Sequence, residues 1–85
     1  MTTSELLERI SINNSICHGK PCIKETRVMV HQVLELIAAD IPVEEITSEK
    51  YFPHITKEDV RACVAFANQL VKNEEIQFYE SRKAV

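Results

Sequence analysis

Apolar residues recur at helical spacing in two separate stretches of the chain, and this periodicity restricts the fold more than any other feature. In the first stretch, which begins at Val30, they occupy positions i, i+3, i+4, i+7 and i+8. A second, longer stripe begins at Val60. Each segment can bury one face, which predicts amphipathic helices around a shared core. The stripes consist of Val30, Val33, Leu34, Ile37 and Ala38, and of Val60, Cys63, Val64, Ala67, Leu70 and Val71.

Prolines and capping residues divide this helical region into three. Pro42 ends the first helix, because the residue before a proline is pushed out of the α conformation, and a short second helix starts there. Thr56 is expected to cap the third helix together with Asp59 three residues later. Asn73 is a candidate end of this helix, and the residues beyond it could either extend the helix or become ordered only against a partner. Residues 30–73 are therefore predicted to form a three-helix bundle of the helix-turn-helix type.

A short β-ribbon is expected in front of the bundle. Gly19 is the only glycine of the chain. Because Lys and Pro follow it, we expect it to take a positive φ at a turn. The segments 16–17 and 22–23 on either side then form two extended arms. A two-stranded ribbon is marginal alone, so it should lie on the helices or pair with a second copy.

The N-terminal residues leave two structures open. Residues 4–10 could form a short helix with Ser4 as its cap, or they could lead directly into a strand. Ile10 and Ile12 alternate with a serine, which suits a strand with one buried face. The first residues lack the basic and apolar regions of a secretory signal, and no apolar run approaches the length that spans a bilayer. We therefore expect a cytoplasmic protein with no membrane partner.

The length of 85 residues fits one domain with little stability to spare. Residues 1–29 are expected to form the arm and ribbon, residues 30–73 the bundle, and residues 74–85 a C-terminal tail. Association with another chain is expected from the start. The tail carries Ile76, Phe78 and Tyr79 among charged residues, and we expect these three side chains to contact a protein partner.

Charge is distributed unevenly along the sequence. Residues 31–60 hold two lysines against seven acidic residues, a net charge of −5, whereas the whole chain carries −3. A protein that held DNA through its middle would place lysines and arginines there. The acidic middle instead favours a basic protein partner.

No catalytic residue, cofactor or metal is expected. The three cysteines are an odd number, which argues against a disulfide framework. Cys17, His18 and Cys22 form the only metal-like cluster, but four residues separate the cysteines and no fourth ligand is evident. Cys17 and His18 are neighbours, so in a strand they would point to opposite faces and could not form a nucleophile–base pair. His31 and His54 are expected to face solvent.

Two motifs resemble the DUF433 family of small prokaryotic proteins. The first reads Gly19-Lys20-Pro21-Cys22-Ile23-Lys24-Glu25-Thr26-Arg27-Val28, similar to the family's G-K-P-x-I-x-G-T-R-I, and Val30, Val33 and Leu34 match the V-x-x-[IV]-L that follows. The second, Tyr51-Phe52-Pro53-His54-Ile55-Thr56-Lys57-Glu58-Asp59-Val60, is similar to Y-P-x-L-T-x-E-D-[IV] with one extra residue between Tyr and Pro. The match runs from about Arg9 to Ala67.

This resemblance implies a homeodomain-like three-helix fold behind an N-terminal β-ribbon, often dimeric. It also implies an antitoxin-like partner of a PIN-like ribonuclease toxin. The chain departs from the family where Glu25 and Asp40 replace glycines and Met29 replaces a frequent proline. We therefore do not expect Glu25 to take positive φ freely, whereas Asp40 can mimic glycine at some cost.

Candidate residues fall into two further groups. A nucleic-acid-binding role would use cations of the ribbon and outward residues of the third helix, although Glu58 and Asp59 at that helix start would repel phosphates. For the second group, residues of the two motifs, a purely structural role is the simpler interpretation. Arg27 belongs to both groups, and we expect it to pair with an acidic residue of the segment 31–60. The nucleic-acid candidates are Lys20, Lys24, Arg27, Lys57, Arg61 and Asn68; the structural candidates are Gly19, Pro21, Thr26, Arg27, Pro53, Thr56 and Asp59.

The leading functional hypothesis is an antitoxin-like homodimer, formed through the ribbon, that holds a PIN-like toxin and weakly binds its own operator DNA. A second hypothesis is a stand-alone DNA-binding transcriptional regulator. A third is a small domain without any role in a toxin–antitoxin pair. A small enzyme is disfavoured because no nucleophile–base or metal constellation is visible in the sequence.

Overall fold

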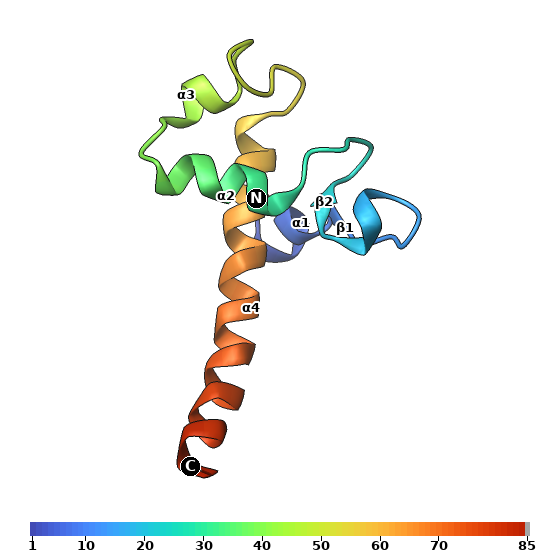
Figure 1. Cartoon of the computed structure of the whole chain (residues 1–85). Coiled ribbons are helices and arrows are strands. Elements are labelled where there is room, and N and C mark those ends of the chain that lie inside the picture. Colours follow the sequence, from blue (N-terminus) through green and yellow to red (C-terminus); the bar gives the residue numbers. More distant parts are fainter. Residues whose placement is uncertain (85) are drawn as a thin grey trace.

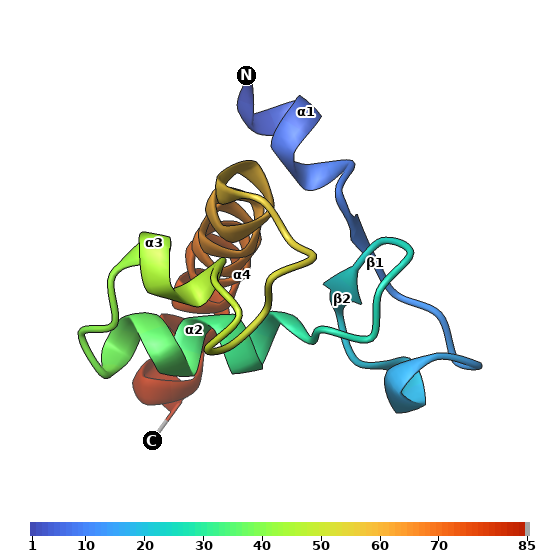
Figure 2. The same ribbon diagram turned by 90° about the horizontal axis from the view of Figure 1, so that it is seen from above.

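The computed structural model describes the backbone of residues 1–84 and the side chains of residues 1–73. It is mainly helical with one short antiparallel sheet, which confirms the coarse fold expected from the sequence. Figure 1 shows α4 running out from the rest of the molecule, and Figure 2 shows α2 and α3 on one side of α4 and the ribbon on the other. The elements are α1 (Thr3–Leu7), β1 (Ile10–Ser11), a 3-10 turn (Cys17–Gly19), β2 (Cys22–Ile23), α2 (Val30–Ala38), α3 (Val43–Ile46) and α4 (Lys57–Ala84).

Of the two structures left open for the N-terminus, the helix forms, but Thr2 and not Ser4 caps it. The Thr2 hydroxyl accepts a hydrogen bond from the backbone N–H of Glu5 at 3.2 Å. The Glu5 carboxylate accepts in return from the backbone N–H of Thr2 at 3.0 Å. This hydrogen bond from the backbone and a second one from the Thr2 hydroxyl lower the pKa of Glu5. The reciprocal bonds make a capping box, which fixes where α1 begins.

The expected ribbon pairing around Gly19 is wrong. Strand β2 pairs with Ile10–Ser11, and not with residues 16–17, in a register of Ile10 with Ile23 and Ser11 with Cys22. Cys17, His18 and Gly19 have φ values of 54°, 56° and 78°. Three successive left-handed residues form a tight turn and cannot continue a strand. The positive φ expected for Gly19 is confirmed, and a Cβ there would lie 3.1 Å from the Asn14 Oδ1 atom.

Helix α2 begins and ends where the sequence indicates, and a left-handed residue follows it. Asp40 has a φ of +65°, and the Ile41 N–H donates back to the carbonyl of Leu36 at 3.0 Å. Asp40 thus takes the conformation that glycine often supplies after a helix. Glu25 also takes a left-handed φ of +62°, so the expectation that it would avoid this region is wrong. The chain therefore bears the backbone cost of a non-glycine residue at both positions.

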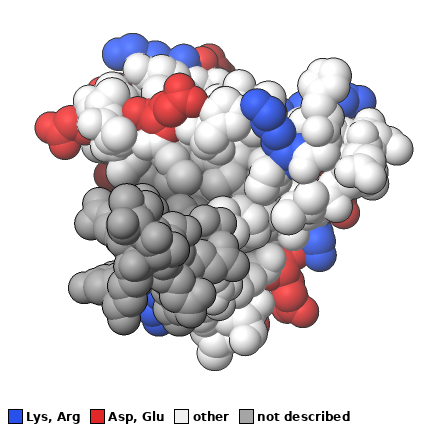
Figure 3. All heavy atoms as spheres, turned by 60° about the horizontal axis from the view of Figure 1, so that its bottom comes forward, with Lys and Arg blue, Asp and Glu red and all other residues white. Residues whose placement is uncertain are grey.

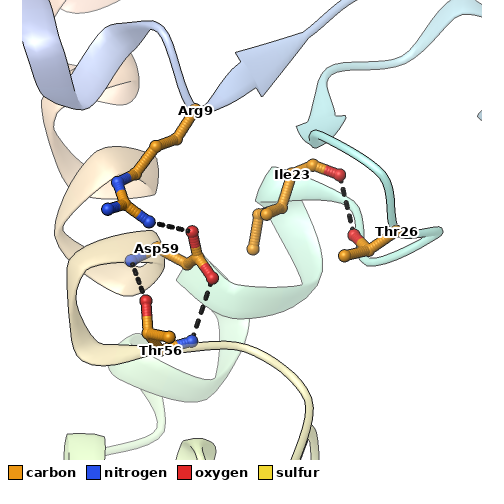
Figure 4. Close-up of polar contacts among 5 residues, drawn as sticks. All are labelled: Arg9, Ile23, Thr26, Thr56 and Asp59. Carbon is orange, nitrogen blue, oxygen red and sulfur yellow. Dashed lines mark hydrogen bonds and ion pairs between the residues drawn. The ribbon is translucent and has the colours of Figure 1, made fainter.

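The start of α4 has the expected capping box and carries an additional ion pair. The backbone N–H of Asp59 donates to the Thr56 hydroxyl at 3.2 Å, and the Asp59 carboxylate accepts from the backbone N–H of Thr56 at 2.9 Å. Its second oxygen accepts from the Arg9 guanidinium at 3.0 Å (Figure 4). Asp59 therefore joins the N-terminal segment, just before β1, to the first turn of α4. Of the two structures left open beyond Asn73, the helix is the one that forms, and α4 continues to Ala84.

The core covers only the beginning of α4. Val60 and Cys63 are buried among residues of α1, the ribbon, α2 and α3. The rest of the apolar stripe does not follow them inward, because Val64, Leu70 and Val71 are 47%, 46% and 60% exposed. The buried apolar residues are Leu6, Ile10, Cys22, Ile23, Val28, Val30, Val33, Ile46, Ile55, Val60, Ala62 and Cys63.

The bonds of Asp59 predict a graded loss of stability. We expect Asp59→Ala to lower the free energy of unfolding by about 3 kcal/mol, because it removes a helix cap and leaves Arg9 unpaired. Asp59→Asn keeps a capping side chain, so we expect a loss of only about 1 kcal/mol. Urea unfolding followed by circular dichroism measures both. Equal losses in the two variants would contradict the capping role of this side chain, because only the alanine variant removes the cap.

The left-handed conformation of Glu25 predicts a stabilising substitution. Glu25→Gly removes the clash of Cβ with the backbone, and we expect it to raise the free energy of unfolding by about 0.5–1 kcal/mol. Glu25→Ala is the matched control, because it removes the same carboxylate but keeps Cβ. Thermal unfolding compares the two, and an equal gain in the alanine variant would show that the backbone is not the cause.

Candidate functional site

An apolar groove lies between α4 and the other helices. It has a volume of about 670 Å³, and eight of its eleven lining residues are apolar. Its three polar residues all come from α4. The groove is lined by Leu6, Ile37, Ile41, Val43, Ile46, Lys57, Val60, Arg61, Val64, Ala65 and Asn68.

Three of the nucleic-acid candidates meet at this groove. Lys57, Arg61 and Asn68 stand at i, i+4 and i+11 on α4, so they share one face of the helix. All three are exposed. Neither Lys57 nor Arg61 forms an ion pair within residues 1–73. The groove therefore has an apolar floor, with the side chains of Lys57, Arg61 and Asn68 along one edge.

The three basic candidates of the ribbon are not brought together. Lys20, Lys24 and Arg27 each line a different hollow of the surface. Figure 3 shows lysines and arginines interspersed with acidic residues on the face drawn there, without one continuous basic patch. The expected pairing of Arg27 with an acid of the middle segment is not formed among the described side chains. Its backbone carbonyl instead accepts from the Cys17 thiol at 3.7 Å.

Most of the structural candidates form hydrogen bonds in turns and between neighbouring elements. The Thr26 hydroxyl donates to the Ile23 carbonyl at 2.8 Å (Figure 4) and accepts from the Val28 N–H at 3.1 Å, which closes the loop after β2. The Pro21 carbonyl accepts from the Val30 N–H at 3.0 Å and so links the ribbon to α2. Pro53 lies exposed in the turn before α4. These contacts close the loop after β2 and hold the ribbon against α2.

The histidines and cysteines are not gathered at one place, although Cys17 and Cys22 are neighbours. His31 contacts Glu35 through its Nδ1 atom at 2.7 Å, and the ring of His54 packs edge-on to that of Phe52. Cys17 is half-buried, and burial together with the neighbouring Cys22 raises its pKa. Among the side chains that the structure describes, no three His, Cys, Asp or Glu residues are placed to hold a metal ion.

The groove is not among the features expected from the sequence, although the sequence carries a signal for it. The stripe on the third helix continues to Val71, well past the reach of the short helix α2 that packs on it. At 1.5 Å per residue, α2 spans about 14 Å and α4 about 42 Å. Because α4 is longer than the helix that packs on it, the far part of its apolar stripe stays exposed in a single copy of the chain. The side chains of Ile76, Phe78 and Tyr79, which we expect to contact a partner, lie outside the described residues.

Comparison with known families gives one match. A family model described as "Protein of unknown function (DUF433)" matches residues 10–67. No curated protein and no solved structure matches the chain. In the described part of the chain, no helix has both the length and the apolar character needed to cross a bilayer.

The burial of Cys63 predicts a dependence of stability on alkaline pH. Burial, and secondarily the charge of Asp59, raises the pKa of the Cys63 thiol from 9.0 to about 12. The unfolded thiol ionises at lower pH than the folded one, so this residue's contribution to stability is intact below pH 9 and falls above it. Cys63→Ala should show a shallower decline, by about 1 kcal/mol between pH 9 and 10. Parallel pH profiles for both proteins would contradict this.

Proposed function

Because the chain belongs to the DUF433 family, whose function is unknown, we propose its role from its surfaces: it is a non-catalytic protein that acts by binding other macromolecules. One observation carries this proposal, namely the amount of apolar surface that one copy leaves uncovered. Ile37 and Val64, which line the groove, are 38% and 47% exposed, and Leu70 and Val71 follow farther along α4. Contiguous exposed apolar surface marks interaction sites in proteins of this size.

The side chains of the groove are better suited to binding another protein than to catalysis. Its floor consists of aliphatic side chains from four helices, and its three polar residues include no acid or thiol. Covering a half-exposed valine or leucine yields about 1 kcal/mol. Several such residues together can therefore supply a useful part of a binding free energy, without any reacting group.

We further propose an antitoxin-like role, in which the partner is a basic PIN-like ribonuclease. The support is the acidic segment, which we define as Glu35, Asp40, Glu44, Glu45 and Glu49 on and around α2 and α3. All but Glu45 are exposed. A ribonuclease that binds a polyanion has a basic surface, so an exposed acidic surface would speed its encounter with this chain.

A DNA-binding regulator is the second candidate. The observation in its favour is the shared face of Lys57, Arg61 and Asn68 on α4, the third of the helices α2, α3 and α4, which would serve as the recognition helix of a helix-turn-helix unit. Two features weigh against it. The floor beneath these residues is apolar, and Glu58 and Asp59 occupy the helix start where base contacts are usually made.

Inhibition of a PIN-like ribonuclease encoded beside this chain tests the proposal. We expect the wild-type chain to bind the ribonuclease and suppress its activity. Glu44→Lys combined with Glu49→Lys should weaken binding at least tenfold, since close charge pairs across interfaces contribute on the order of 1–3 kcal/mol. Glu8→Lys combined with Glu25→Lys is the matched control, with the same change of net charge on exposed residues away from the acidic segment.

Two results would contradict the antitoxin-like role. One is the absence of binding by the wild-type chain; the other is an equal loss in both double variants, which would indicate a response to net charge alone. Binding to duplex DNA at two salt concentrations tests the second candidate in parallel. A steep loss of DNA affinity with salt, without any ribonuclease binding, would favour the regulator.

A further inference from the structure

The polar side chains of the groove stand in a line and do not converge on one point. Lys57, Arg61 and Asn68 lie at i, i+4 and i+11 on α4. At 1.5 Å per residue, the first two are about 6 Å apart along the helix axis, and the third lies about 10 Å beyond the second. Pockets for small molecules hold their ligand by a few polar groups that converge on it. This groove instead suits an elongated occupant that presents polar groups along its length.

The walls of the groove offer little to the backbone of an occupant. Its lining residues belong to α1, α2, α3 and α4, apart from Ile41 between α2 and α3. The Ile41 N–H already donates to the carbonyl of Leu36 at 3.0 Å. Backbone groups within helices are bonded along the helix, so an extended peptide laid here would bury unpaired N–H and C=O groups of its own. A helix satisfies its own backbone and needs only apolar side chains for the floor.

The charges on α4 indicate which kind of helix fits. Lys57 and Arg61 are exposed, and neither forms an ion pair within residues 1–73. We propose that the groove binds an amphipathic helix of a protein partner, with the apolar face of that helix on the floor and two carboxylates, one turn apart, against Lys57 and Arg61. Acidic residues at i and i+4 of a helix have the same spacing of about 6 Å as the two cations. A helix that runs along α4 therefore places both pairs in register.

The side of the groove away from α4 carries the opposite charge. Ile41 and Val43 line it. Their neighbours in the sequence, Asp40 and Glu44, belong to the acidic segment and are exposed. Basic residues on the second flank of the partner helix would face these acids. Turning the helix end to end exchanges its flanks while the apolar face stays on the floor, so the two charges select one direction of binding.

This inference rests on the proposal that the chain acts by binding other macromolecules, and it names the segment that is bound. It does not require the partner to be a ribonuclease. The acidic segment supplies attraction toward a basic surface, whereas the groove supplies apolar contact and the spacing of the two cations on α4. The two surfaces can therefore be tested separately.

Fluorescence anisotropy with a synthetic peptide tests the charge pairing. The probe is a labelled, acetylated and amidated helix of about 18 residues, with leucines on one face, glutamates on one flank and lysines on the other. We expect it to bind the full chain at micromolar concentration. Lys57→Glu combined with Arg61→Glu should weaken binding roughly tenfold, because two attractions become repulsions. A second peptide with lysines in place of the glutamates should bind this double variant more tightly than it binds the wild type.

The matched control for charge is Lys20→Glu combined with Lys24→Glu. Both lysines are exposed and line other hollows of the surface, so the same change of net charge should leave probe binding unchanged. Circular dichroism checks that every variant keeps its helices. Equal weakening by the two double variants would overturn the proposal, because it would show a response to net charge alone.

A pair of valine and leucine variants tests the floor. Val64 and Leu70 are 47% and 46% exposed on the same helix, but only Val64 lines the groove, and Leu70 lines a separate hollow. Val64→Gln should weaken probe binding roughly fivefold, since it removes an apolar contact. Leu70→Gln should leave binding unchanged. Equal effects of the two variants would overturn the assignment of the groove.

Three further results would overturn the proposal. One is the absence of probe binding by the wild-type chain. Another is displacement of the probe by an equal concentration of decanoate, which would assign the groove to small amphiphilic anions. The third is a probe affinity that falls as the concentration of the chain rises, which would assign the groove to a second copy. Probe binding without ribonuclease binding would keep this inference and remove the antitoxin-like role. Ribonuclease binding without probe binding would do the reverse.

Discussion

Asp59 makes the connections on which the rest of the structure depends. Its carboxylate accepts hydrogen bonds from the Thr56 backbone and from the Arg9 guanidinium, while its own N–H donates to the Thr56 hydroxyl. One side chain, only 8% exposed as a whole residue, thus fixes the first turn of α4 and fastens the N-terminal segment to it. The direction in which α4 leaves the body follows from this joint.

A helix that is fixed at one end and much longer than its neighbours presents a surface that the chain cannot cover. The buried core takes in Val60, Ala62 and Cys63, and Ala65 and Phe66 pack against it while only partly buried, but the apolar side chains continue to Val71. Residues of the kind that a larger domain would bury are exposed here, because Val64, Leu70 and Val71 are 47%, 46% and 60% exposed. In the proposed role these residues supply the apolar part of a binding surface.

Sequence patterns among neighbouring residues correctly predicted the helices that depend on them. The spacing from Val30 to Ala38 and the pair of Thr56 and Asp59 predicted α2 and the start of α4, because helix periodicity and capping are properties of neighbouring residues. The alternation at Ile10 correctly indicated a strand, but its pairing with β2 could not be obtained in the same way, since register depends on contacts between distant residues. The groove was missed because a stripe shows which face is apolar, and only the lengths and packing of α2 and α4 decide how much of it is covered.

Amide hydrogen exchange at two protein concentrations would test most directly whether α4 is completed by another chain. If a second copy covers α4, amides of residues 64–73 will exchange more slowly as the concentration rises, because association shields and stabilises this part of the helix. Amides of residues 60–63, which are already held by the core, should be equally protected at both concentrations. Exchange in 64–73 that does not change with concentration would contradict it.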